Sequence, residues 1–138
     1  MATDDMNNPP HLERLDGLDV PRALEFLDGD AALLSELLAT FMVDAPGELR
    51  NFQEALQSRD ETAVQKYLHR AAPTLAIIAS EGLANDARKA HEQLRAGKQT
   101  LEELAPSLGA LALCMDKLLT QAQAWLAQNP GTPFQGSR

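Results

Sequence analysis

Apolar residues recur three and four positions apart over most of the chain, and no window alternates with the two-residue period of a strand. This spacing is typical of amphipathic helices, because about 3.6 residues make one helical turn. The same region is rich in alanine and leucine and poor in β-branched residues, which also favours helix. The pattern therefore predicts an all-α protein.

Capping residues and helix breakers divide the pattern into six predicted helices. Aspartate and threonine favour the position before a helix, because their side chains accept hydrogen bonds from its first amides, whereas glycine and proline end or interrupt one. The helices are expected at residues 20–27, from 31 to a break at Asp44-Ala45-Pro46, and then at 45–58, 61–80, 83–96 and 101–127. The first helix is expected to follow Asp19, the expected caps are Asp30, Asp44 and Asp60, and Thr100 forms a capping-box pattern with Glu103.

Short connections join the long helices, and such connections favour antiparallel neighbours. We therefore expect an up-and-down antiparallel four-helix bundle with additional short N-terminal helices covering one end. Clusters of asparagine and proline lie near both ends of the chain and break the periodic pattern. The expected organisation is a flexible tail over residues 1–18, the helical bundle over 19–128, and a second flexible tail over 129–138.

Composition narrows the possible functions. The formal net charge is -8 and the pI is about 4.7, so the chain repels a phosphate backbone and is not expected to bind nucleic acid. No apolar run approaches the roughly 20 residues that span a bilayer, and no signal peptide is visible. We expect a cytoplasmic monomer that does not insert into membranes.

Metal and cofactor sites find no support in the sequence. The chain lacks the glycine-rich phosphate loop, the His-Glu-x-x-His motif and the Gly-x-Ser-x-Gly motif. Its three histidines, His11, His69 and His91, lie far apart, and a lone cysteine, Cys114, excludes an internal disulfide. We expect no metal site and no cofactor of its own, with His91 and Cys114 as packing residues.

His69 is the residue most open to a functional interpretation. At 100° per residue, one group of apolar positions on the helix at 61–80 falls within about 40° of a single direction, which marks the core face. These positions are Val64, Leu68, Ala71, Leu75 and Ile78. His69 lies about 140° from that direction, so its imidazole is expected on the outer face.

The neighbours of His69 on this outer face are mostly small, which allows another protein to approach the ring closely. The predicted docking residues are Gln65, Ala72, Pro73, Ala76 and Ser80. Lys66 and Arg70 add positive charge nearby and are the candidates for assisting a phosphate group.

The order and spacing of several short segments resemble one protein family. The segments are Leu18-Asp19-Val20 with Ala23-Leu24 and Gly29-Asp30; Leu37-Leu38 with Phe41 and Asp44-Ala45-Pro46; Leu56 with Asp60 and Leu68-His69; and Leu83 with Ala87-Arg88-Lys89-Ala90. From Leu18 to about Leu126 the chain resembles the histidine-containing phosphotransfer (HPt) domain of bacterial two-component phosphorelays.

The resemblance implies a role for His69 in signal transduction. His69 stands where the family carries its phosphoacceptor, so it would become a phosphohistidine and pass a phosphoryl group between receiver-domain aspartates. The implied partners are a response-regulator receiver domain, a hybrid sensor histidine kinase, or both. The receiver supplies the Mg²⁺, and the chain would be a phosphotransfer intermediate rather than an independent enzyme.

The sequence departs from the family after the histidine. The family signature is His, two variable positions, Lys and Gly, whereas this chain has Ala72 and Pro73 at the last two positions. Proline withdraws the amide that would bond to the His69 carbonyl, so a kink or an opened turn is expected there. Two alternatives follow: a binding module of the same fold that docks on a receiver or kinase without phosphotransfer, and an unrelated helical assembly protein with Ile77 and Leu113 on its interface.

Overall fold

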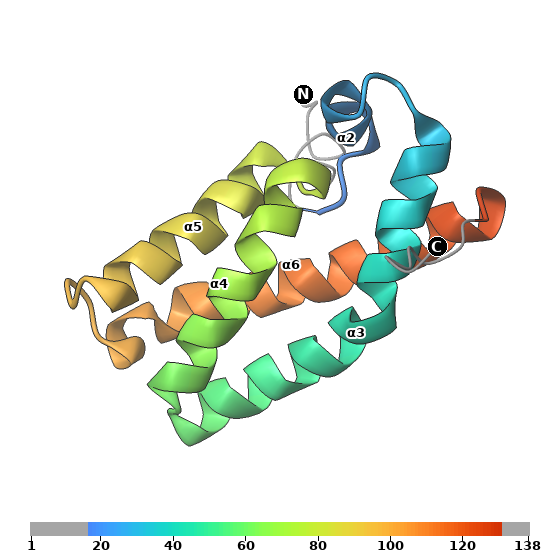
Figure 1. Cartoon of the computed structure of the whole chain (residues 1–138). Helices are drawn as coiled ribbons and strands as arrows, with labels where there is room; N and C mark the ends of the chain where they lie inside the picture. The colour runs from blue at the N-terminus through green and yellow to red at the C-terminus, as the bar shows by residue number, and fades with distance from the viewer. Residues whose placement is uncertain (1–16, 131–138) are drawn as a thin grey trace, which may run out of the picture.

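A computed structural model describes residues 17–130, and within that range the chain forms five helices and no β-strand (Figure 1). In chain order they are α2 (Val20–Phe26), α3 (Ala31–Ser58), α4 (Glu61–Ile78), α5 (Glu81–Arg95) and α6 (Leu101–Gln128). The all-α prediction is confirmed. The tails expected at residues 1–16 and 131–138 lie outside the described residues.

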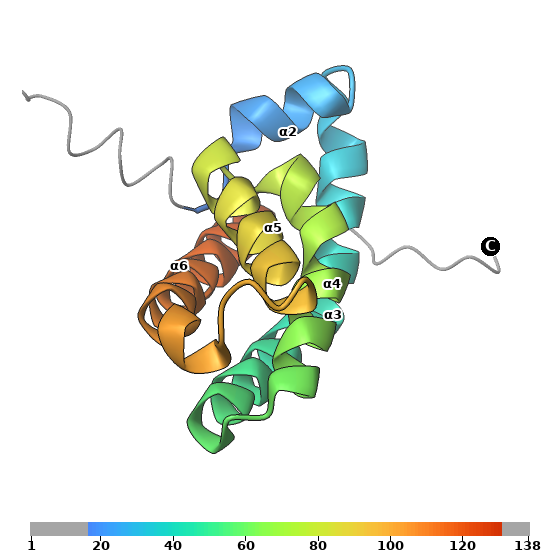
Figure 2. The ribbon, with the colours of Figure 1, turned by 90° about the vertical axis from the view of Figure 1, so that its left-hand side faces the viewer.

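The four long helices form the predicted bundle. α3 packs against α6 and α4, α4 packs against α5, and α5 packs against α6. α2 lies across one end of the bundle and contacts α3 and α4 (Figures 1 and 2). Among the described helices, only α2 is a short N-terminal addition, because the second predicted helix is part of α3.

Each helix begins at a residue whose side chain accepts a hydrogen bond from an amide of the first turn. These N-caps are Asp19, Asp30, Asp60, Ser80 and Thr100. The capping box of Thr100 and Glu103 is present as predicted, with distances of 2.8 and 3.0 Å. Such caps satisfy amides that have no partner inside the helix, which is why the sequence marks helix starts well.

The predicted break at Asp44-Ala45-Pro46 is wrong, because α3 continues through it as one helix of 28 residues with Pro46 inside. Figure 1 shows that the axis of α3 turns in its middle rather than ending there. Proline removes one amide and crowds the carbonyl four residues earlier, which bends a helix. Ala45 and Leu49 are buried on the two sides of Pro46, so core packing holds both arms in place.

The N-terminal tail was predicted to extend to residue 18, but Gly17 and Leu18 belong to the fold. The Leu18 amide donates to Oε1 of Gln121 over 2.8 Å, and the Ser80 amide donates to the Gly17 carbonyl over 2.8 Å. Leu18 is 8% exposed and joins the hydrophobic core. The apolar side chain and these hydrogen bonds fix a segment that has no helical pattern of its own.

The core is largely aliphatic, with one aromatic stack between α3 and α4. The rings of Phe52 and Tyr67 lie 4.3 Å apart and nearly parallel, and burial raises the pKa of Tyr67 well above its usual range. The predicted core face of α4 is confirmed at four buried positions, whereas Ala71 is only partly buried. The four are Val64, Leu68, Leu75 and Ile78.

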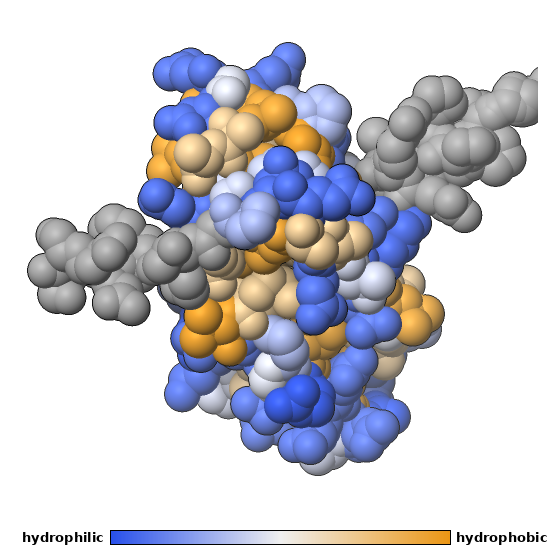
Figure 3. Space-filling model, turned by 90° about the vertical axis from the view of Figure 1, so that its right-hand side faces the viewer, coloured by the Kyte–Doolittle hydropathy of each residue, from blue (hydrophilic) through white to orange (hydrophobic). Residues whose placement is uncertain are grey.

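The described surface is mixed in character. Exposed large apolar side chains occur on α2, α3 and α6, at Phe26, Leu33, Val43 and Leu113. On the face shown in Figure 3, polar side chains separate the apolar patches, so this face carries no continuous apolar surface. Within residues 17–130, none of the helices is long and apolar enough to cross a membrane.

Candidate functional site

His69 lies on the outer face of α4, as its helical position predicted. Leu68, the preceding residue, is fully buried, whereas His69 is exposed. Because successive helical residues point about 100° apart, anchoring Leu68 in the core turns the imidazole of His69 to the outside. The ring is therefore reachable by another protein.

The structure brings a second histidine, His91 of α5, next to His69. Their ring centroids are 5.4 Å apart and the ring planes are inclined by 39°. His91 was expected near the edge of the inward stripe of its helix, as a packing or flank residue, and it is partly buried. Its closeness to His69 could not be read from the sequence, because it depends on how α5 packs against α4.

The pKa of His91 is lower than usual. Partial burial is the largest cause, because it penalises the charged imidazolium, and the positive charges of His69 and Arg95 act in the same direction. The carboxylate of Glu92 opposes them but does not outweigh them. His91 is therefore biased toward its neutral form beside His69.

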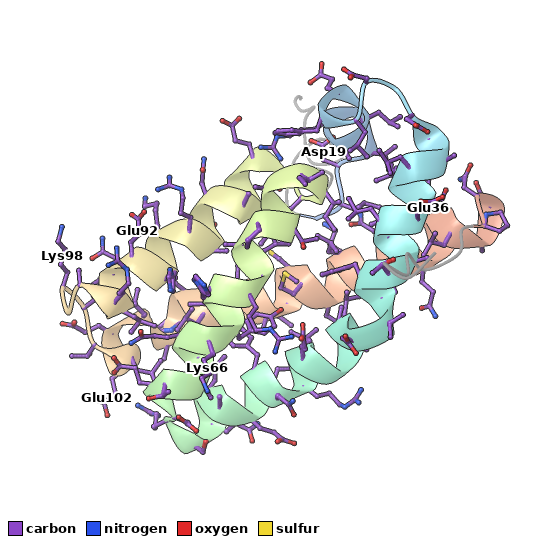
Figure 4. The ribbon with its side chains drawn as sticks, viewed as in Figure 1. Asp19, Glu36, Lys66, Glu92, Lys98 and Glu102 are labelled. Carbon is purple, nitrogen blue, oxygen red and sulfur yellow. The ribbon has the colours of Figure 1, made fainter. Side chains whose placement is uncertain are left out.

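The two basic residues predicted to assist a phosphate group differ in their surroundings. Nη2 of Arg70 lies 2.7 Å from Oε2 of Glu48 on α3, so this guanidinium already has a carboxylate partner. Lys66 is exposed one turn before His69 on α4 (Figure 4). Of these two candidates, Lys66 is the better placed to interact with a phosphate group, because the charge of Arg70 is already paired with Glu48.

Four of the predicted docking residues are at the surface of α4. Pro73 and Ala76 are exposed, and Gln65 and Ala72 are partly buried. Nε2 of Gln65 donates to Oε2 of Glu61 over 3.1 Å. This strip of short side chains next to His69 allows the close approach expected from the sequence.

Ser80 must be removed from the predicted docking strip. Its side chain is fully buried, and its Oγ accepts a hydrogen bond from the Leu83 amide over 3.2 Å as the N-cap of α5. The helical spacing used for the prediction fails there because α4 ends at Ile78 and the chain turns.

A kink or an opened turn was expected at Pro73, and α4 shows no interrupted turn there, since the helix runs from Glu61 to Ile78 with Pro73 inside it. Proline has no amide to offer the carbonyl of His69. His69 and Pro73 are both exposed, so this stretch of α4 is open to solvent, which can take the place of the missing donor.

No cluster of three or more histidine, cysteine or carboxylate side chains suited to a metal ion occurs among residues 17–130. Cys114 is partly buried and packs against the core. It also lines a groove between α5 and α6, which Asp86 and Lys89 line from α5. The groove lies between α5 and α6, whereas the surface around His69 is built from α4 and the adjoining edge of α5 that carries His91.

Comparison with known proteins identifies the fold. No family model matches the chain, and no curated protein matches it. A similar solved structure is the crystal structure of the HPt domain from the Hpt sensor hybrid histidine kinase of Shewanella, with a TM-score of 0.75 and 18% sequence identity. The match covers 83% of this chain and 97% of that domain. This chain therefore has the fold of a histidine-containing phosphotransfer domain.

Proposed function

We propose that this chain is a phosphorelay intermediate in which His69 accepts a phosphoryl group from one receiver-domain aspartate and passes it to another. The observation that carries the proposal is the exposed imidazole of His69 on α4 of an HPt-fold bundle. The similar solved domain belongs to a sensor hybrid histidine kinase, so the proposed partners are a receiver domain and a kinase of this kind.

In the proposed transfer reaction, the bundle only has to hold the imidazole of His69 at its surface. A neutral imidazole nitrogen attacks the phosphorus of the phosphoaspartate in line, the N–P bond forms, and the P–O bond breaks to release the aspartate carboxylate. The receiver would contribute Mg²⁺ and the acidic pocket that holds it. An exposed His69 can enter that pocket, whereas a buried one could not.

The direct test is transfer from phosphorylated receiver domains to the purified chain. We expect a phosphate on the wild-type chain that is labile in acid and stable in base, as phosphohistidine is, and none on His69→Gln. Lys89→Gln is a control, because Lys89 lines the groove on the α6 side of α5. Transfer to His69→Gln at the wild-type level, or none to the wild-type chain from a broad receiver panel, would refute the proposal.

Lys66 is proposed to assist the phosphoryl group, in preference to the ion-paired Arg70. A cation near the transferred group stabilises its developing negative charge. Lys66→Gln is expected to slow transfer several-fold, roughly as the loss of one surface charge would, while Lys89→Gln removes the same charge elsewhere and keeps the wild-type rate. Equal rates in these two variants would exclude Lys66 from this role.

The second candidate function is a docking module that binds a receiver or kinase without phosphotransfer. It is favoured by Ala72 and Pro73, which stand where the family signature has Lys and Gly. In this case binding to the partner survives His69→Gln but is lost in Ala76→Arg, which places a long cation on the exposed strip. Equal affinity of both variants would count against a docking surface at this position.

A further inference from the structure

The two histidines face each other across the interface of α4 and α5. Their ring centroids are 5.4 Å apart, so any group attached to the His69 ring adds its charge close to the imidazole of His91. His91 is partly buried, while His69 is exposed. The proximity therefore couples the exposed ring of His69 to a second, partly buried imidazole.

A phosphoryl group on His69 would add about one and a half to two negative charges near pH 7. The third and fourth positions after His69 offer no positive charge, because they hold Ala72 and Pro73, and the proposed cation Lys66 lies one turn before His69 on α4 itself. The guanidinium of Arg70 is paired with the carboxylate of Glu48 on α3. A proton taken up by His91 would place a compensating charge on the α5 side of the group.

We infer that His91 is a positioning residue for the phosphoryl group on His69: its imidazole takes up a proton from solvent when the group arrives, and the resulting imidazolium holds the group by charge. This inference rests on the proposed function of His69. The covalent step is unchanged, with the N–P bond formed at His69 and the aspartate released as carboxylate. The added proton resides on His91 and returns to solvent when the phosphoryl group leaves.

The surrounding charges explain why His91 would gain a proton on phosphorylation of His69 and lose it afterwards. On α5, Arg95 disfavours the charged form of His91 and Glu92 favours it, while from α4 the positive charge of His69 disfavours it. The charged residues Asp86 and Lys89 line the groove on the α6 side of the helix. Phosphorylation reverses the sign of the contribution from His69, and the pKa of His91 rises as a result.

The inference predicts a direction for pH dependence. Between the lower pKa of His91 in the free chain and its higher pKa in the phosphorylated chain, the phosphorylated form holds one more proton. Its formation therefore becomes more favourable as the pH falls through that window, by up to about tenfold per pH unit. Replacing His91 with a residue that does not titrate removes this part of the profile.

The first test follows the Hε1 and Cε1 NMR signals of His91 through a pH titration in three chains: wild type, His69→Gln and His69→Glu. We expect the pKa of His91 to rise when the His69 charge is removed, and to rise further when a carboxylate replaces it. The exposed position of His69 makes both variants compatible with the fold. The same His91 titration in all three chains would overturn the inference.

The second test phosphorylates His69 chemically with phosphoramidate and measures the modified fraction by mass spectrometry. The reaction is run at about pH 5.5 to 8, because imidazole titrates in this range. His91→Gln should lower the phosphorylated fraction at the acidic end about fivefold, as expected for one lost charge pair at this separation in a mostly aqueous surrounding. His91→Lys should restore it and remove the pH dependence. His69→Gln identifies any phosphate carried elsewhere.

The outcomes separate the two proposals. Wild-type behaviour of His91→Gln at every pH would overturn the role of His91, whatever the receivers do. Neither test needs a receiver domain, so a chain that phosphoramidate modifies in a His91-dependent way, but that no receiver phosphorylates, would refute the proposed function while supporting the coupling of the two rings.

Discussion

The hydrogen bond between Gln121 and Leu18 allows a quantitative prediction. The Leu18 amide donates to Oε1 of Gln121 over 2.8 Å, across 103 positions of sequence, and Leu18 is 8% exposed. Gln121→Ala removes the acceptor and leaves a donor that water reaches poorly. A buried donor without a partner costs about 1–3 kcal/mol, which we expect as the loss in free energy of unfolding.

The assay is unfolding in urea followed by circular dichroism, with the free energy extrapolated to water. Gln123→Ala is the matched control, because Gln123 is exposed on the same helix and its loss should change stability by no more than about 0.5 kcal/mol. Gln121→Glu keeps an acceptor oxygen and should retain most of the wild-type stability. If Gln121→Ala is as stable as Gln123→Ala, the reasoning that the first described residues are held to α6 is refuted.

Three further predictions concern the core, the surface and pH. Phe52→Ala removes a fully buried ring stacked on Tyr67, and should lower the free energy of unfolding by about 3–5 kcal/mol in urea titrations. Arg70→Ala breaks a 2.7 Å ion pair with Glu48, but the arginine side chain is 68% exposed, so the same measurement should change by less than about 1 kcal/mol. Stability should fall as the pH drops below about 6.5, because the pKa of His91 is lowered from that value in the folded chain and the unfolded chain then binds more protons. His91→Gln should lessen this fall in thermal unfolding at pH 7 and pH 5.

Each of these predictions has a result that contradicts it. Gln53→Ala, at an exposed neighbouring position, controls for the removal of a side chain from α3. If it lowers the free energy of unfolding as much as Phe52→Ala does, the stacked ring of Phe52 has no special part in stability. A large loss in Arg70→Ala would mean that the ion pair stabilises the bundle. An unchanged slope of stability against pH in His91→Gln would mean that this ring titrates alike in both states.

Local signals predicted the helices well, and local signals also explain the errors. Aspartates at positions 30 and 60 cap helices as expected, since capping involves only residues that are close in sequence. Pro46 was assigned to a boundary because proline disfavours helix interiors. Buried contacts on both sides of it outweigh that preference, and their partners lie in other helices.

The candidate site divides in the same way. The outward direction of His69 followed from the helical period of its own segment, and the structure confirms it. The approach of His91 depends on the packing of α5 against α4, which no spacing within either helix specifies. The ion pair of Arg70 with Glu48 was missed for the same reason, because it also joins two helices.

The bend in α3 has a consequence for the local opening of this protein. Pro46 has no amide, so the carbonyl of Met42 lacks its partner one turn ahead, and the ladder of main-chain hydrogen bonds is interrupted there. Proteins open locally in cooperative units, and a missing hydrogen bond inside a helix marks a boundary at which such a unit can end. The arm of α3 that begins at Ala31 can therefore open separately from the arm that follows Pro46, and native-state amide exchange should find different protection on the two sides of this proline.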